Sequence, residues 1–147
     1  MKKNPKEMTL SPHGRNKILH HEGGHNLKKY VDDSGKQHIG VGHLIKVGEI
    51  FPNQITLNES EMLFDADLKW SIDAVKKHVK VPLTQNQFDA LVSFVYNIGE
   101  SQFKTSSVLK NINAGIQGET IKENFLAWNR PPSAFARRKK EVELYFT

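Results

Sequence analysis

The chain has 147 residues, a length that indicates one compact domain. It contains no cysteine, which excludes disulfide bonds and thiolate metal sites. Its formal net charge of +5 at pH 7 indicates an anionic partner. The lysines are scattered rather than gathered with aromatic residues, so the composition argues against nucleic-acid binding. No run of residues approaches the roughly 20 apolar positions of a membrane span, and the first residues lack the apolar stretch of a signal peptide, so we expect no stable membrane insertion.

The first predicted helix begins after Ser11. Ser11 is a typical N-cap residue, and Pro12 suits the first position of a helix. The pair Gly23-Gly24 ends this helix, which places Glu22 at its C-terminus. Unpaired carbonyl groups at a helix C-terminus create a negative potential that favours the protonated form of a carboxylic acid. Glu22 is therefore a candidate proton donor.

A short β region follows this helix. Residues 26–47 contain apolar strand positions on both sides of the turn-forming run Asp32-Asp33-Ser34-Gly35. An aspartate in such a run is ordinarily a turn residue whose side chain binds nearby backbone amides. The pattern predicts a small, glycine-rich β-hairpin.

Beyond residue 56 the apolar residues recur at helical spacing. Thr56 with Glu59, and Thr84 with Gln87, form the capping-box pattern that begins a helix. The first box predicts a long helix at 57–79, and the second predicts a central buried helix that ends at Gly99. Three further helices are predicted at about 106–113, 120–129 and 133–146.

These elements predict an α+β fold in a single domain. A small N-terminal lobe, residues 12–60 with the first helix and the hairpin, would be joined by the helix at 57–79 to an all-helical lobe at 82–147. A cleft between two such lobes is a typical binding place for a polymer.

Residues 21–25, His-Glu-Gly-Gly-His, match the HExxH pattern of zinc metalloproteases. That chemistry requires both histidines on one face of a continuous helix, where they share the zinc ion. Each glycine in a helix interior costs about 1 kcal/mol relative to alanine, so two adjacent glycines favour a helix break. We expect no metal here and keep the metalloprotease as a minor alternative.

The same glutamate belongs to a longer pattern. Glu22 is followed by Tyr30, Asp32 and the run from Ile39 to His43, Ile-Gly-Val-Gly-His. This arrangement resembles the phage T4 type of lysozyme, family 24 of the glycoside hydrolases. The resemblance covers residues 15–143 and includes the following segments: 82–99, Phe103, Ser106, Asn113, Trp128, Arg137-Arg138 and Glu141. It implies a lysozyme-like fold and a muramidase that cuts between N-acetylmuramic acid and N-acetylglucosamine, without metal or organic cofactor.

The resemblance assigns roles to three residues near the hairpin. Glu22 would be the catalytic acid and Asp32 the second carboxylate. One residue is inserted between them relative to the family, which makes Asp33 an adjacent candidate. His38 stands where the family has threonine, and a neutral imidazole could act as a general base, attack the anomeric carbon as a nucleophile, or only bind a water molecule. The first role predicts inversion of configuration and the second predicts retention.

Saccharide-binding positions follow from the same resemblance. They are Leu44, Tyr96, Asn97 and Ser106. Tyr96 could equally be a core residue at helical spacing, and Asn97 could cap the end of the central helix. Trp128 is expected in the core. One arginine of the pair Arg137-Arg138 is a candidate partner for Glu22 at the cleft rim.

The resemblance implies a phage endolysin that acts as a monomer on the glycan strands of peptidoglycan. With no signal peptide, it would stay in the host cytoplasm until a separate holin admits it to the periplasm and cell wall. The main alternative is a non-catalytic peptidoglycan-binding relative, in which His38 and the insertion mark lost chemistry.

Overall fold

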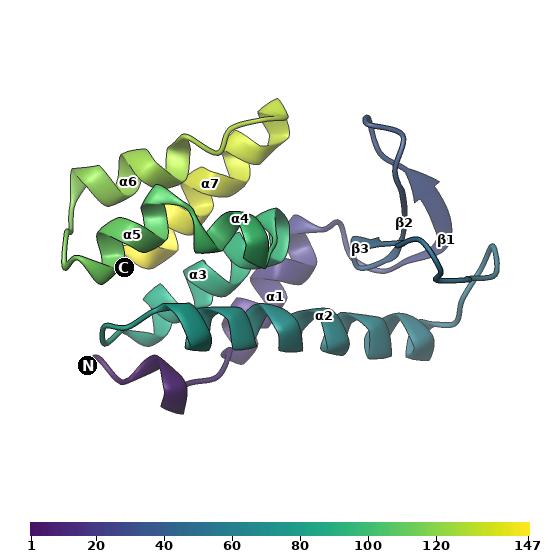
Figure 1. The fold of residues 1–147 in the computed structure, drawn as a ribbon. Coiled ribbons are helices and arrows are strands. Elements are labelled where there is room, and N and C mark those ends of the chain that lie inside the picture. Colours follow the sequence, from purple (N-terminus) through teal and green to yellow (C-terminus); the bar gives the residue numbers. More distant parts are fainter.

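In the computed structural model, which describes residues 1–147, a long helix lies beneath both a helical region and a small sheet (Figure 1). The helices are α1 (Pro12–His21), α2 (Leu57–His78), α3 (Gln85–Ile98), α4 (Glu100–Lys104), α5 (Ser107–Asn113), α6 (Glu119–Leu126) and α7 (Pro132–Tyr145), preceded by a 3-10 turn, η1 (Pro5–Glu7). The strands are β1 (Asn26–Val31), β2 (Gln37–Gly40) and β3 (His43–Leu44). None of the helices combines the length and the apolarity that spanning a membrane requires. The expected α+β class is confirmed.

The predicted helix starts are confirmed by their caps. The Ser11 hydroxyl accepts a hydrogen bond from the Gly14 amide, and both predicted capping boxes are present at the starts of α2 and α3. Gly23 and Gly24 adopt φ angles of +80° and +81°, which end α1 just before them. Glu22 is the C-cap residue of α1, as predicted.

Helix α1 packs against α3 of the helical region, whereas the sequence analysis assigns it to the N-terminal lobe. The Ser11 amide donates to Asp89 Oδ1 over 3.1 Å, and the Ser11 hydroxyl donates to Asp89 Oδ2. At Gly14 a Cβ atom would lie 2.6 Å from Asp89 Cγ, so only glycine allows this close approach. Glu22 therefore extends from the helical region toward the sheet.

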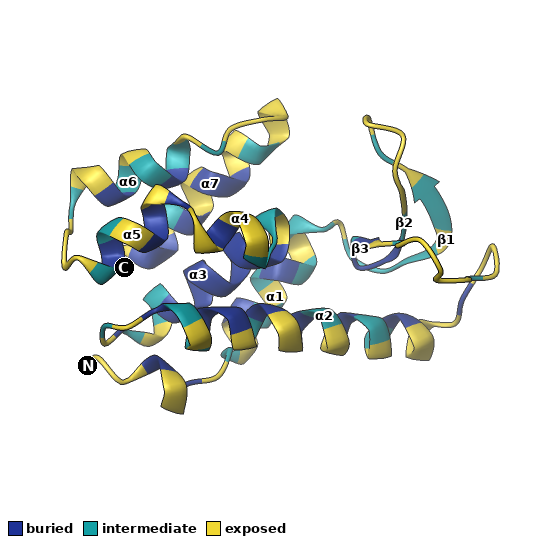
Figure 2. Cartoon of the chain, in the orientation of Figure 1, coloured by how far each residue is buried: buried dark blue, intermediate teal, exposed yellow.

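Helix α3 forms the centre of the core, and Figure 2 shows it buried along most of its length. Phe94 makes edge contacts with Phe103, Phe125 and Trp128, whose ring centroids lie 5.1–6.2 Å away. The short helix α4 was not predicted, because five residues are too few to display a helical period. Helix α6 ends at Leu126, three residues before the predicted end at 129.

The sheet is antiparallel with the strand order β1-β2-β3. Tyr30 pairs with His38 across β1 and β2, and Ile39 pairs with His43 across β2 and β3. Helix α2 holds the sheet from below: Ser60 lies against Gly40, and its hydroxyl is 2.6 Å from His25 Nδ1. The register places His38 and His43 on neighbouring strands.

Candidate active site

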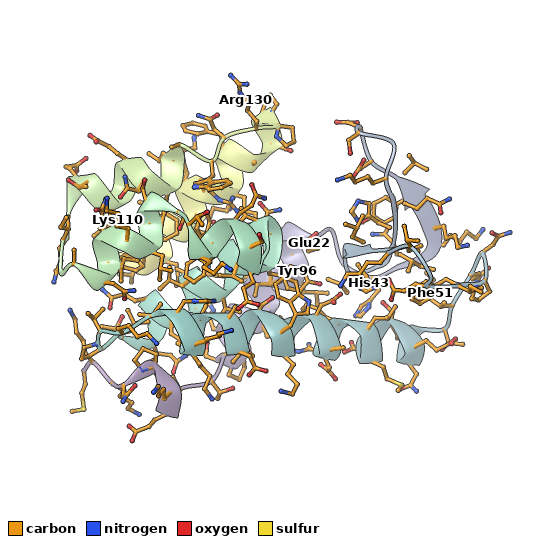
Figure 3. The ribbon with its side chains drawn as sticks, viewed as in Figure 1. Glu22, His43, Phe51, Tyr96, Lys110 and Arg130 are labelled. Atoms are coloured by element: carbon orange, nitrogen blue, oxygen red, sulfur yellow. The ribbon has the colours of Figure 1, made fainter.

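Glu22 lies where the helical region meets the sheet, close to Tyr96 (Figure 3). Its side chain is 17% exposed, and Oε2 accepts a hydrogen bond from Arg137 Nη1 over 2.5 Å. Gly42, in the turn between β2 and β3, has a φ of +66°, and a Cβ atom there would lie 2.2 Å from Glu22 Oε1. The turn can approach the carboxyl group so closely only because residue 42 is glycine.

Arg137 is the arginine that pairs with Glu22. It also donates through Nε to Glu141 over 3.1 Å and through Nη2 to the Ser93 carbonyl over 3.0 Å. Burial lowers the pKa of Arg137, but the charges of Glu141 and Glu22 outweigh burial and raise it. The guanidinium group is therefore a fixed cation that holds the Glu22 carboxyl group in one position.

Two grooves meet at Glu22. One has a volume of about 630 Å³ and runs between the sheet, α2 and α3. The other, about 570 Å³, runs toward α7 and is lined by arginine, lysine and histidine side chains, of which Arg137 and Arg138 are paired with carboxylates. Glu22, Asn97 and Ile98 line both grooves. The basic side chains of the second groove are His20, His21, Arg130, Arg137, Arg138 and Lys140. A linear polymer that follows both grooves passes directly over Glu22.

Asp32 and His38 form a hydrogen-bonded pair at the turn end of the hairpin. Asp32 Oδ2 lies 2.7 Å from His38 Nε2, while Oδ1 accepts hydrogen bonds from the Ser34 amide and hydroxyl and from the Lys36 amide. The Ser34 hydroxyl, the His38 ring and the Lys36 amide together hold the pKa of Asp32 well below its usual range. Asp32 is thus an ionised carboxylate that is both the turn residue and the partner of His38.

His38, rather than Asp32, lines the groove. The imidazole is stacked on Tyr30, with ring centroids 5.3 Å apart and an interplanar angle of 15°. Its Nδ1 atom lies 3.3 Å from the carbonyl oxygen of Gly42, next to Glu22. His38 pairs with Asp32 and not with Asp33, the other candidate for the second carboxylate, which is exposed.

The predicted saccharide-binding residues fall into two groups. Leu44, Tyr96 and Asn97 all line the groove beside Glu22. Tyr96 is only 9% exposed, and its hydroxyl donates to the Val41 carbonyl over 2.5 Å, so it is largely a structural residue. Ser106 does not line either groove.

Ser106 has a structural role instead. It is buried and caps α5: its hydroxyl donates to the Phe103 carbonyl over 2.8 Å and accepts from the Leu109 amide over 3.1 Å. The donor proton and one lone pair of the hydroxyl are used inside the helical region, and the buried side chain lines neither groove, so the geometry lends no support to the expectation that Ser106 binds saccharide. Trp128 packs on Phe94, as expected, but its other edge lines the basic groove.

The HExxH interpretation fails on backbone geometry. Helix α1 ends at His21, and the two glycines turn the chain before His25. His21 lines the basic groove, where burial and the charges of Arg137 and Arg138 lower its pKa to about 3. His25 faces α2 instead, with Nε2 2.9 Å from Glu61. The two imidazoles therefore do not share one helix face, and no group of three or more potential ligands is close enough to hold a metal ion.

A family model for phage lysozyme matches residues 20–141 of the chain. The chain belongs to the phage lysozyme family. It is 38% identical to the endolysin of Salmonella phage P22, over 95% of this chain and 99% of that protein. Among solved structures, the endolysin of Escherichia coli O157:H7 phage FAHEc1 has a TM-score of 0.82 at 34% identity, over 95% of this chain and 94% of that one. The muramidase domain of SpmX from Asticaccaulis excentricus has a TM-score of 0.77 at 30% identity, over 96% and 99%.

The site of this family member contains a cluster that the sequence analysis missed, centred on His43. The imidazole is buried; Nδ1 lies 2.8 Å from Asp67 Oδ2 and Nε2 lies 3.1 Å from Glu49 Oε2. Asp67 Oδ1 accepts a hydrogen bond from the Trp70 indole over 3.0 Å. Glu49 and Asp67 lie in segments that meet only in three dimensions, so no local pattern predicts their contact with His43.

The His43 contacts connect the sheet to α2 and depend on pH. The hydrogen bond to Asp67 raises the pKa of His43, burial opposes the rise, and Glu49 adds to it. The unfolded pKa of histidine is about 6.5. A histidine whose pKa is higher in the folded state stabilises the fold fully at pH values below about 6.5. This contribution is lost as the pH rises through the pKa of the folded state.

We expect His43→Asn to lower the free energy of unfolding by about 2 kcal/mol at pH 5.5, because the charged hydrogen bonds are lost. At pH 9 the difference between variant and parent should be smaller, since the parent then loses part of the same contribution. Thermal unfolding at both pH values measures it, with the exposed His13→Asn as the control. An equal difference at both pH values would contradict the assignment.

Proposed function

We propose that the chain is a phage endolysin, an N-acetylmuramidase that hydrolyses the β-1,4 bond between N-acetylmuramic acid and N-acetylglucosamine in peptidoglycan. The observation that carries this proposal is the position of Glu22, a carboxyl group fixed by Arg137 where two grooves meet. Membership of the phage lysozyme family and similarity to endolysins support the same activity. Arg130 and Lys140 in one groove and the net charge of +5 suit an anionic wall polymer.

Hydrolysis of a glycosidic bond requires a proton for the leaving oxygen and an activated water on the other face of the sugar. Glu22 donates the proton. When the proton has left, Arg137 compensates the negative charge of the carboxylate at the hydrogen-bond distance of 2.5 Å. Because Gly42 has no side chain, the turn leaves space for the carboxyl group at this position.

We assign the activation of water to His38, supported by Asp32. If Nε2 donates its proton to Asp32 over 2.7 Å, Nδ1 carries the lone pair. The Gly42 carbonyl oxygen, 3.3 Å from Nδ1, can only accept hydrogen bonds, so a water molecule that donates to Nδ1 has to take the place of this contact at the edge of the groove. A water molecule there can give a proton to Nδ1 while its oxygen attacks the anomeric carbon. Stacking on Tyr30 keeps the ring orientation fixed. We therefore propose the general-base role, with inversion, and leave nucleophilic attack by the imidazole as the alternative that the test below separates from it.

We expect His38→Ala to reduce the rate of hydrolysis by about 10²-fold, the usual contribution of one general base. His38→Thr should recover activity to within about tenfold of the parent, because a hydroxyl can still hold the water. Nuclear magnetic resonance of a soluble oligosaccharide digest should show the α-anomer first, since the substrate bond is β. A first-formed β-anomer would assign His38 as a nucleophile, and full activity of His38→Ala would remove it from the mechanism.

Analysis of the cleaved bond tests the proposed function directly. Purified peptidoglycan is digested, the new reducing ends are converted with borohydride, and the product is hydrolysed and identified. A muramidase yields reduced muramic acid, a glucosaminidase yields reduced glucosamine, and a lytic transglycosylase leaves anhydro ends that borohydride cannot reduce. Sedimentation with peptidoglycan without any new ends would instead support the non-catalytic binding relative.

The proposed lysis role also sets where the enzyme acts. We infer that it accumulates in the host cytoplasm, passes a separate holin, and works as a monomer on glycan strands in the periplasm and cell wall. The two grooves belong to one chain, so cleavage does not need a second copy. We propose no nucleic-acid partner, no stable membrane insertion and no cofactor.

A further inference from the structure

Trp70 presents an exposed indole ring inside the groove of about 630 Å³ that runs from Glu22 along α2. Its side chain remains 37% exposed, although tryptophan is among the most strongly buried residues on average. The ring is stacked on Tyr96 with an interplanar angle of 9° and centroids 6.3 Å apart. Tyr96 itself is 9% exposed, so Trp70 provides most of the aromatic surface in this part of the groove.

The indole ring is held in place by its neighbours on α2. Its Nε1 donates to Asp67 Oδ1 over 3.0 Å, and the other oxygen of Asp67 binds His43. Tyr96, beneath the ring, is fixed by its own hydrogen bond to the Val41 carbonyl. Because these contacts order the ring before any ligand arrives, a ligand that packs on it loses little side-chain entropy.

The rim of the groove around Trp70 is polar. Leu44 adds apolar surface, while Lys46, Asn97 and Glu100 supply a cation, an amide and a carboxylate. A flat aromatic face with hydrogen-bonding groups at its edge matches a sugar ring, whose C–H groups form an apolar face and whose hydroxyl and acetamido groups point outward. A wholly apolar ligand would give the Lys46 ammonium and the Asn97 amide no hydrogen-bond partner, whereas Glu100 already pairs with His78 Nε2 over 2.8 Å.

We propose that Trp70 is the aromatic platform of a saccharide subsite, on which an N-acetylhexosamine ring of the glycan strand packs at a distance from the cleaved bond. This inference rests on the proposed function, because it takes the glycan strand as the ligand. The subsite lies in the same groove as Glu22 but on α2, whereas Glu22 ends α1. Loss of the platform should therefore weaken binding of long oligosaccharides more than short ones and leave the chemical step unchanged.

Two variants separate the aromatic face from the hydrogen bond. Trp70→Phe and Trp70→Leu both lose the indole N–H group that binds Asp67, but only Trp70→Phe keeps an aromatic face. We expect Trp70→Leu to weaken binding of a β-1,4 N-acetylglucosamine hexamer by about tenfold, and Trp70→Phe by no more than about threefold. Isothermal titration with the dimer and the hexamer measures this. Phe146→Leu, an exposed aromatic residue outside both grooves, is the control and should leave both affinities unchanged.

Equal weakening in the two Trp70 variants would overturn the proposal, because the effect would then come from the lost Asp67 contact. So would equal weakening for dimer and hexamer, or none at all. Thermal unfolding of both variants confirms that they are folded before titration. The titration does not require hydrolysis, so it is independent of the muramidase proposal. If Trp70 contributes to hexamer binding but the protein releases no reducing muramic acid ends, the subsite is supported and the muramidase activity is rejected.

Discussion

Glu22→Gln is expected to reduce the rate of peptidoglycan hydrolysis by about 10³-fold or more, the contribution of a general acid, while the fold persists. Glutamine has the shape of glutamate and its amide oxygen can still accept the hydrogen bond from Arg137, but it has no proton to give to the leaving oxygen. Arg137 also keeps its contacts with Glu141 and the Ser93 carbonyl, so the buried cation remains compensated. The measurement is turbidity clearing of permeabilised Gram-negative cells, together with release of reducing ends.

The matched control for this prediction is Glu123→Gln. It makes the same chemical change on the exposed face of α6, outside both grooves, and should leave clearing unchanged. Sedimentation with insoluble peptidoglycan should be retained in Glu22→Gln, because the groove surfaces are intact. Clearing at the parental rate by Glu22→Gln would exclude it as the acid, and no clearing by the parent would favour the non-catalytic relative.

The parts of the fold that sequence predicted are those set by local chemistry. Capping boxes at Thr56 and Thr84 and the glycine pair after Glu22 act through backbone hydrogen bonds and φ angles within a few residues. The position of Glu22 at a helix end follows from them. The packing of α1 on α3 could not be foreseen in this way, since it depends on Asp89, a buried carboxylate 78 residues from Ser11.

The candidate site also contains features that the sequence predicted and features that only the structure shows. The resemblance identified His38 and Asp32 as site residues. The hairpin register brings them together: Tyr30 on β1 pairs with His38 on β2, and Asp32 begins the turn directly after β1. The sequence could not show that His38, rather than Asp32, lines the groove. Ser106 shows the same limit: a match of residue type at a family position did not reveal that its side chain is buried and that its hydroxyl caps α5.

Glu141 is the buried charge on which the arginine pair depends. Its side chain and that of Arg138 are each 1% exposed. The carboxylate accepts hydrogen bonds from Arg138 Nε over 2.6 Å, from Arg137 Nε over 3.1 Å and from the Ser93 hydroxyl over 2.5 Å. Burial lowers the pKa of Arg138 even though Glu141 opposes this effect, which shows how poorly that cation is solvated. Glu141 therefore pairs with both arginines and is the only carboxylate bound to Arg138, while Arg137 also pairs with Glu22.

Glu141→Gln is expected to lower the free energy of unfolding by about 3 kcal/mol, because removing one partner of a buried ion pair leaves the other charge uncompensated. The variant should still fold, since domains of this size have a stability of roughly 5–15 kcal/mol. Urea unfolding measures the loss, and Glu143→Gln, exposed on the same helix, should change stability by less than about 0.5 kcal/mol. An equal change in the free energy of unfolding for both variants would contradict this role of Glu141. Glu22 and Ser93 would then be sufficient partners for Arg137. Arg138 would be stabilised by the ring of Phe94, whose centroid lies 5.0 Å away.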